Sequence, residues 1–162
     1  MMTDSLKDKN ILFISVQFFN YENIISQKLK TFGANVFYYD ERPSNSIFTK
    51  GMLRFKKDFF KNKVNRYYTN ILNEVQSKKI DYFFLIKGEV IPKFFIEKLK
   101  DLFPNIVLIY YNFDSYLNNP NAIEIIPFFD RKFTFDHSDA KDYNLQFQPL
   151  FFSDHYQSIY SC

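Results

Sequence analysis

The 162 residues of this chain are enough for one domain and leave no comfortable room for two. A formal net charge of +3, with 24% charged and 46% hydrophobic residues, is typical of a globular protein, and we expect no nucleic-acid partner. Three glycines and one cysteine exclude a dinucleotide fingerprint, a P-loop, a disulfide framework and a cysteine-based zinc site.

Other classes are disfavoured by pattern rather than by composition. The two histidines, His137 and His155, do not form a metal-ligand spacing, and we expect no metal site. Neither a secretory signal nor an apolar run of membrane-spanning length is present, so the sequence predicts a cytoplasmic protein. An aromatic content of 21% has two interpretations, carbohydrate-stacking surfaces or the codon bias of a low-GC genome.

Short apolar runs alternate along the chain with stretches of helical periodicity. In chain order the expected elements are a strand at 10–16, a helix at 21–32, a strand at 35–39, a helix at 64–79, a strand at 80–87, a helix at 92–102, a strand at 106–111, a helix at 121–129, a strand at 131–135, a helix at 138–143 and a strand at 145–150. This alternation predicts a Rossmann-like three-layer α/β/α domain with a central parallel sheet. We expect the strand order 3-2-1-4-5, with a sixth strand as an option.

The segment 49–63 is an amphipathic, basic insertion between the second strand and its crossover helix. One face of a helix drawn through it carries Lys50, Arg54, Lys57 and Lys61. Two interpretations stay open. The segment is either a helix that packs on the domain with its basic face in water, or a peripheral contact with an anionic membrane surface, to which each cation contributes on the order of 1 kcal/mol.

Polar residues follow the expected strands at their carboxyl ends, where ligands bind in open parallel sheets. These residues are Asp40, Glu41, Arg42, Lys87, Glu89, Asp114 and Asp136. Structural interpretations stand beside the functional ones. Lys87 and Glu89 can form a turn with a surface ion pair, and Asp114 and Asp136 can cap the helices that follow them.

Four blocks of the sequence resemble, in order and spacing, bacterial surface-polysaccharide glycosyltransferases of the capsule, lipopolysaccharide-core and CgeB-like group. The blocks are Tyr-Asp-Glu-Arg-Pro-Ser-Asn at 39–45, Ile-Lys-Gly-Glu at 86–89, Tyr-Tyr-Asn-Phe-Asp-Ser at 110–115, and Phe-Phe-Asp-Arg-Lys-Phe-Thr-Phe-Asp at 128–136 with Gln-Pro-Leu-Phe-Phe at 148–152. Phe113 is a departure, since the family often has tryptophan before the Asp-Ser pair.

The resemblance implies that residues 1–152 are the N-terminal, acceptor-side half of a two-domain GT-B enzyme, with 153–162 as the start of an interdomain linker. It implies a saccharide or lipid-linked acceptor bound by Asp40, Glu41, Arg42, Lys87, Glu89 and Asp136. Asp114 is the first choice for the general base. No cofactor is expected in this chain itself. A nucleotide sugar would bind only with a C-terminal half, supplied by a further domain or a separate chain.

The alternative hypothesis is a non-catalytic flavodoxin-like binding module or a receiver-like domain. A receiver needs a phosphorylatable aspartate at the end of the third strand, where this chain has Lys87. It also needs acids after the first strand, where this chain has Gln17 and Phe18.

Overall fold

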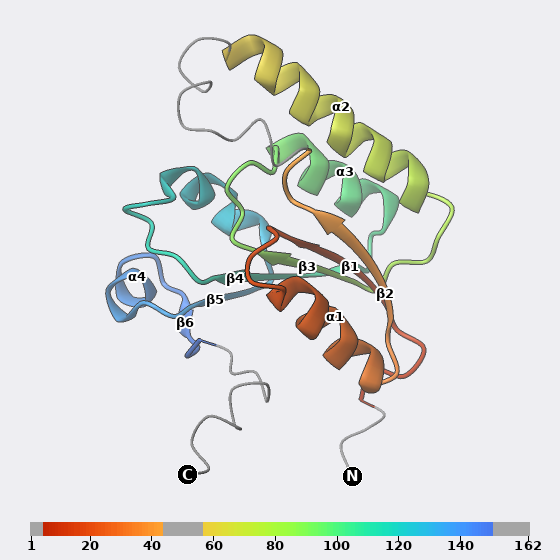
Figure 1. The fold of residues 1–162 in the computed structure, drawn as a ribbon, viewed down its shortest axis with the longest axis horizontal. Coiled ribbons are helices and arrows are strands. Elements are labelled where there is room, and N and C mark those ends of the chain that lie inside the picture. Colours follow the sequence, from red (N-terminus) through yellow and green to blue (C-terminus); the bar gives the residue numbers. More distant parts are fainter. Residues whose placement is uncertain (1–4, 44–56, 151–162) are drawn as a thin grey trace.

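The structure is a computed structural model that describes residues 5–43 and 57–150, with the side chains of 57–60 excepted. Its centre is one sheet of six parallel strands, in the order β2-β1-β3-β4-β5-β6 (Figure 1). The strands are β1 (Asn10–Ser15), β2 (Asn35–Asp40), β3 (Tyr82–Ile86), β4 (Val107–Asn112), β5 (Arg131–Thr134) and β6 (Gln146–Phe147). The predicted α/β class with a central parallel sheet is confirmed.

The predicted order 3-2-1-4-5 is wrong, because β1 pairs with β2 on one side and with β3 on the other. The burial of the strands explains the difference. Strand β1 is buried at five of its six positions, which suits a central strand. Strand β2 ends in Tyr38, Tyr39 and Asp40, is nowhere fully buried, and forms the edge.

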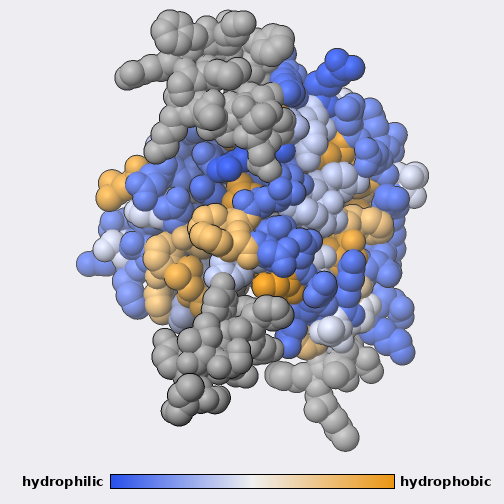
Figure 2. Space-filling view, viewed as in Figure 1, coloured by the Kyte–Doolittle hydropathy of each residue, from blue (hydrophilic) through white to orange (hydrophobic). Residues whose placement is uncertain are grey.

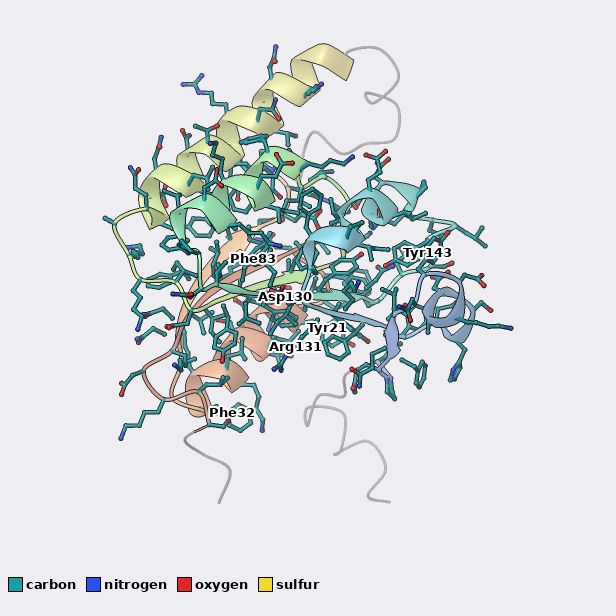
Figure 3. The ribbon with its side chains drawn as sticks, turned by 180° about the vertical axis from the view of Figure 1, so that it is seen from behind. Tyr21, Phe32, Phe83, Asp130, Arg131 and Tyr143 are labelled. Carbon is teal, nitrogen blue, oxygen red and sulfur yellow. The ribbon has the colours of Figure 1, made fainter. Side chains whose placement is uncertain are left out.

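Helices cover the two faces of the sheet unequally (Figures 1 and 3). One face carries α2 (Lys57–Val75), α3 (Lys93–Leu102) and the 3-10 helix η3 (Pro120–Phe128), and the larger buried cluster lies beneath them. The opposite face carries α1 (Tyr21–Thr31) and a smaller cluster. The short α4 (His137–Asp142) lies beside β5 and β6.

Local sequence explains where these helices begin and end. Helix α1 is followed by Gly33, whose φ of +90° suits glycine, as the periodicity predicted. Pro120 and Pro127 lack backbone N–H donors, and the segment expected as an α-helix at 121–129 is a 3-10 helix instead. The crossover helix was expected from 64 but begins at Lys57, so the second half of the basic insertion belongs to α2.

Much of the aromatic content fills the larger core. Tyr68 of α2 and Phe95 of α3 meet edge to face with ring centroids 4.8 Å apart. Phe83 of β3 stacks on Phe129, with ring centroids 5.9 Å apart. Among the described residues, no helix is both long and apolar enough to cross a membrane.

Candidate functional site

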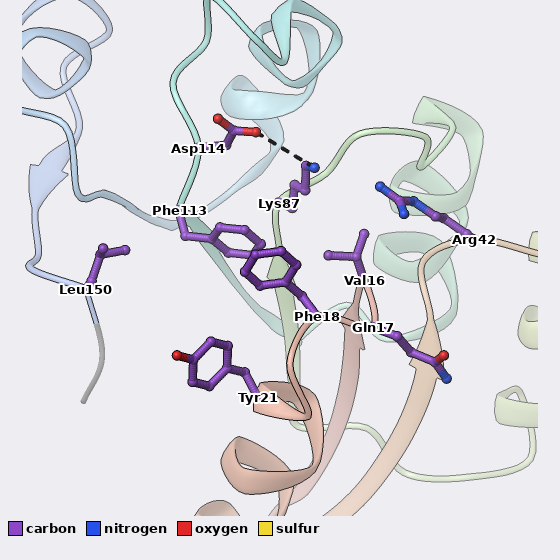
Figure 4. A pocket seen from close by; sticks show the side chains of 9 residues that line it. All are labelled: Val16, Gln17, Phe18, Tyr21, Arg42, Lys87, Phe113, Asp114 and Leu150. Atoms are coloured by element: carbon purple, nitrogen blue, oxygen red, sulfur yellow. Dashed lines mark ion pairs between the residues drawn. The ribbon is translucent and has the colours of Figure 1, made fainter. Parts of the chain in front are cut away.

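A cleft of about 520 Å³ opens at the carboxyl ends of β1, β3 and β4. Its walls come from the loops after β1, β2, β3 and β4, from the start of α1 and from the segment that follows β6 (Figure 4). The lining residues are Val16, Gln17, Phe18, Tyr21, Arg42, Lys87, Phe113, Asp114 and Leu150. Three of the residues that the sequence predicted for a site, Arg42, Lys87 and Asp114, therefore share one cleft.

Lys87 enters the cleft from a strained backbone. Its φ of +82° lies in the left-handed region that side-chain-bearing residues rarely adopt. Hydrogen bonds on both sides of the residue hold it there. Its N–H donates to the carbonyl of Tyr111 at 3.0 Å, and its carbonyl accepts from the Tyr110 hydroxyl at 2.9 Å and from Asn119 Nδ2 at 3.0 Å. Strain that the surroundings enforce in this way is concentrated at functional sites.

The neighbouring Gly88 completes the turn. Its φ is +70°, and a Cβ atom there would lie 2.7 Å from Cδ1 of Ile125 and 3.2 Å from Cε2 of Tyr110. A side chain here would strain the backbone and would displace the end of Ile125. Glycine is therefore favoured on structural grounds within the block 86–89.

Two cations and two carboxylates form a charge network at the cleft. Lys87 Nζ lies 3.3 Å from Glu89 Oε2 and 3.8 Å from Asp114 Oδ2, and Arg42 Nη2 lies 2.7 Å from the same Glu89 oxygen. Burial by itself would raise the pKa of Glu89, but the hydrogen bond from Arg42 and the charge of Lys87 bring that pKa below its ordinary value. The two positive and two negative charges of the network therefore cancel, and hydrogen-bond donors lie beside acceptors.

Glu41 was expected to bind an acceptor, but the structure places it in the interior. Its side chain is 0% exposed and accepts the N–H groups of Gly88 at 3.2 Å and Val90 at 2.7 Å. Burial raises the pKa of Glu41 to about 7, against the opposing effect of the hydrogen bond from Val90. Glu41 is thus a positioning residue that fastens the β3–α3 loop to the end of β2.

Of the other carboxylates predicted to bind a ligand, one lines the cleft and one does not. Asp114 lies in the cleft, but its Oδ1 already accepts the N–H of Ser115 at 2.9 Å and Asn118 Nδ2 at 3.0 Å. Asp40 lies at the same edge of the sheet, accepts the N–H of Arg42 at 2.9 Å, and does not line the cleft.

Asp136 is the N-cap of α4, not a lining residue of the cleft. Its Oδ1 accepts the N–H groups of Ser138 at 2.8 Å and Asp139 at 3.0 Å. The structural interpretation of this residue is therefore the one that the geometry supports. The adjacent His137 is exposed, with its ring stacked on Phe147 at 3.8 Å.

An aromatic wall opposite Lys87 was not foreseen. Phe18 stacks on Phe113 with centroids 5.7 Å apart and planes at 23° (Figure 4). Phe19 and Asn20, with φ of +49° and +65°, form a strained turn that leaves Phe18 46% and Phe19 75% exposed. The signal was present in the sequence, because two phenylalanines directly follow β1 and Phe113 follows β4.

The basic insertion stays a prediction. Lys50 and Arg54 lie outside the described residues, and Lys57 is placed only through its backbone in α2. Lys61 is exposed on α2. Within residues 5–43 and 57–150, no cluster of three or more histidine, cysteine or acidic side chains could hold a metal ion.

Comparison with known proteins adds little to this geometry. No family model matches the sequence, and no curated protein matches it. One similar solved structure is that of two RcsB dimers bound to DNA, with a TM-score of 0.45 and 14% identity over 88% of this chain and 64% of that one, less than two thirds of its length. Another is a pilus assembly-related protein from Burkholderia pseudomallei, with a TM-score of 0.36 and 16% identity over 72% of this chain and 71% of that one.

The fold and the cleft together define a class. This is an α/β domain of flavodoxin-like strand order, with a cleft at the carboxyl edge of β1, β3 and β4. Its function has to be argued from the cleft, because the fold alone supports many activities.

Proposed function

We propose that this domain is a saccharide-binding module whose ligand lies in the cleft between Lys87 and the aromatic wall of Phe18 and Phe113. The observation that carries the proposal is the strained, hydrogen-bonded backbone of Lys87, whose side chain lines the same cleft as Phe18 and Phe113. Ion pairs with Glu89 and Asp114 hold its ammonium group there. An apolar surface with a few fixed polar groups is the usual composition of a small-molecule site.

The chemistry of the cleft matches a sugar on both sides. The C–H face of a pyranose packs against aromatic rings, and Phe18 presents such a ring at the cleft. Sugar hydroxyls both donate and accept hydrogen bonds. The network of Lys87, Arg42, Glu89 and Asp114 offers charged donors and charged acceptors within one ligand's reach.

A phosphate-bearing ligand fits less well. A phosphate would bind at the N-terminus of α1 in many α/β folds, but here the first turn carries the buried carboxylate of Glu22, which accepts the N–H of Phe18 at 3.2 Å. The charge network is also balanced, so an anion would face Glu89 and Asp114 as well as the two cations. A neutral, hydroxyl-rich ligand avoids both costs.

The carboxylates that a receiver-like domain needs are not found at the carboxyl ends of β1 and β3. Strand β3 is followed by Lys87, and β1 by Val16, Gln17 and Phe18, so no carboxylate stands at the phosphoacceptor position or directly after β1. A binding module is the part of that alternative hypothesis that we retain.

The acceptor half of a glycosyltransferase is a second candidate. It is favoured by the meeting of Arg42, Lys87, Glu89 and Asp114, which come from three of the blocks that carry the resemblance. In that case the same cleft would hold the acceptor sugar, and Asp114 would have to release its hydrogen-bond donors to act as a base. The donor site would lie on another domain or chain.

A glycan array followed by calorimetry tests the proposal. We expect Lys87→Met and Phe18→Ala each to weaken saccharide binding by about tenfold or more, because each removes a charged hydrogen bond or a stacking face. Lys98→Met is the matched control, since Lys98 is exposed on α3, pairs with Asp101 at 3.3 Å and does not line the cleft. The proposal is wrong if no saccharide binds, or if the three variants bind equally well.

A further inference from the structure

Three polar side-chain atoms near the cleft are buried without a hydrogen-bond partner in the described part of the chain. They are Nδ2 of Asn112, the hydroxyl of Tyr116 and Oδ1 of Asn119, and their residues are 0%, 3% and 2% exposed. Figure 2 shows hydrophilic residues over much of the molecular surface, where solvent satisfies their polar groups. These three residues are buried away from that solvent, and nearly all buried polar groups in native proteins have a partner.

The orientation of both asparagine amides is fixed by the hydrogen bonds that they do make. Asn112 Oδ1 accepts the N–H of Asp114 at 3.2 Å, so Nδ2 is the donor left over. Asn119 Nδ2 donates to the carbonyl of Lys87 at 3.0 Å, so Oδ1 is the acceptor left over. Turning either amide would put two donors or two acceptors face to face. The unpaired amide atoms are therefore one donor and one acceptor.

Shared contacts place the three atoms in the same neighbourhood. The carbonyl of Lys87 accepts the Tyr110 hydroxyl at 2.9 Å as well as the Asn119 amide. The Tyr116 hydroxyl lies beside the Tyr110 hydroxyl and the Asn112 side chain, although neither contact has the geometry of a hydrogen bond. An unpaired donor, an unpaired acceptor and a hydroxyl that can act as either are thus gathered around one carbonyl.

We propose that one buried water molecule binds between Asn112, Tyr116 and Asn119. The water accepts the N–H of Asn112 Nδ2, donates one O–H to Asn119 Oδ1, and forms its third hydrogen bond with the Tyr116 hydroxyl. About three hydrogen bonds are usual for a buried water. A metal cation would face the N–H of Asn112 and an anion would face the oxygen of Asn119, so a neutral molecule that both donates and accepts fits this site.

The water connects two loops that carry charged groups of the cleft. Through Asn119 it adjoins the carbonyl of Lys87, and through Asn112 it adjoins the N–H of Asp114. Lys87 and Asp114 both line the cleft. The water therefore holds the loop after β4 against the end of β3, whatever ligand the cleft binds.

A crystal structure of the full chain tests the site directly. We expect density for one water, whose oxygen lies within about 3.2 Å of Asn112 Nδ2 and of Asn119 Oδ1. The proposal is wrong if this density is absent while other buried waters are seen. It is also wrong if the two amide atoms bond directly to each other or to other protein groups.

Oxygen-17 relaxation dispersion counts long-lived buried waters in solution. Tyr116→Phe removes the hydroxyl and keeps the ring that packs on Tyr143 with centroids 4.7 Å apart. We expect this variant, and Asn112→Leu, to lose the contribution of one water relative to the wild type. Tyr67→Phe is the matched control, because it removes a hydroxyl that donates to the carbonyl of Asp40 at 2.7 Å, away from the site. Equal dispersion in all four proteins would overturn the proposal.

Amide hydrogen exchange tests the connection between the loops. The N–H of Lys87, which donates to the carbonyl of Tyr111, should exchange faster in Tyr116→Phe than in Tyr67→Phe. Global stability is matched by comparing both rates with that of the Leu12 amide in the buried strand β1. An unchanged ratio of the Lys87 and Leu12 rates would show that the water does not support the loop that carries Lys87.

Discussion

Lys87 shows how one residue can be placed against its own conformational preference. Its left-handed backbone is held by the carbonyl of Tyr111, the hydroxyl of Tyr110 and the amide of Asn119. The stabilising contacts come from β4 and from the residue preceding η3, so the folded domain, not the local sequence, sets this angle. We therefore infer that position 87 is a lysine because of its ammonium group, since the left-handed backbone by itself would favour glycine.

A pair of substitutions at this position tests that interpretation. Lys87→Gly should be more stable than Lys87→Ala by about 1 kcal/mol, because a left-handed residue with a Cβ costs about that much and glycine does not. Both variants should lose saccharide binding alike. Urea unfolding of the two variants measures the difference. An alanine variant as stable as the glycine variant would show that position 87 is not strained.

Glu41 gives a dependence of stability on pH. Its pKa is raised from 4.5 to about 7 in the folded state, so the folded protein binds a proton more tightly than the unfolded chain. The stability that this group contributes is complete below pH 4.5 and is lost as the pH rises through about 7.

The matched variant is Glu41→Gln, which does not titrate and keeps one oxygen acceptor, enough for one of the two N–H groups, because Gly88 and Val90 donate to different oxygens of Glu41. The lost hydrogen bond lowers the stability of the variant by an amount that does not depend on pH, so the test reads the pH dependence of the difference and not its size. We expect the free energy of unfolding of the wild type, measured relative to this variant, to fall between pH 4.5 and 7.5. A difference that stays constant or rises over that range would contradict the burial of an ionisable group at this position.

Among the elements, periodicity identified the strands and helices but not their neighbours. The runs at 10–16 and 80–87 were recognised as buried strands, yet their direct pairing was missed because apolar content does not reveal which strand lies beside which. The polar end of β2, with Asp40, was the available sign of an edge strand. Shared placement at the carboxyl edge was predicted for Lys87 and Asp114, because it follows from parallel pairing alone.

The parts of the site that could not be predicted lie in loops. The turn at Phe19 and Asn20 has no glycine to signal its positive φ angles, so the aromatic wall had no recognisable local pattern. Glu41 follows a strand like the other candidates. Only the tertiary structure shows that it turns inward to Gly88 and Val90 instead of outward to solvent.

The role of Asp136 is tested at the scale of its helix. Asp136→Ala should cost about 1 kcal/mol of stability through loss of the α4 N-cap, whereas Asp136→Asn should cost much less. Neither variant should alter saccharide binding, because Asp136 does not line the cleft. Thermal unfolding and calorimetry together measure both effects. Loss of binding with unchanged stability would restore Asp136 as a binding residue.

At the scale of the whole molecule, the two faces of the sheet differ in what they have left to bury. The face with α2, α3 and η3 is filled by the larger cluster, whereas Phe84 and Phe133 on the face with α1 remain half-buried among the described residues. The cleft lies where the face with α1 meets the carboxyl edge of the sheet (Figure 4). The proposed saccharide site therefore lies on one side of the domain.

The central claim, that the cleft binds a saccharide, is tested most directly by a nitrogen–proton NMR titration of the labelled chain with the best ligand from the glycan array. We predict saturable shifts centred on the amides of Phe18, Lys87 and Asp114. Saturable shifts confined to residues outside the cleft, or none with any saccharide, would contradict the account.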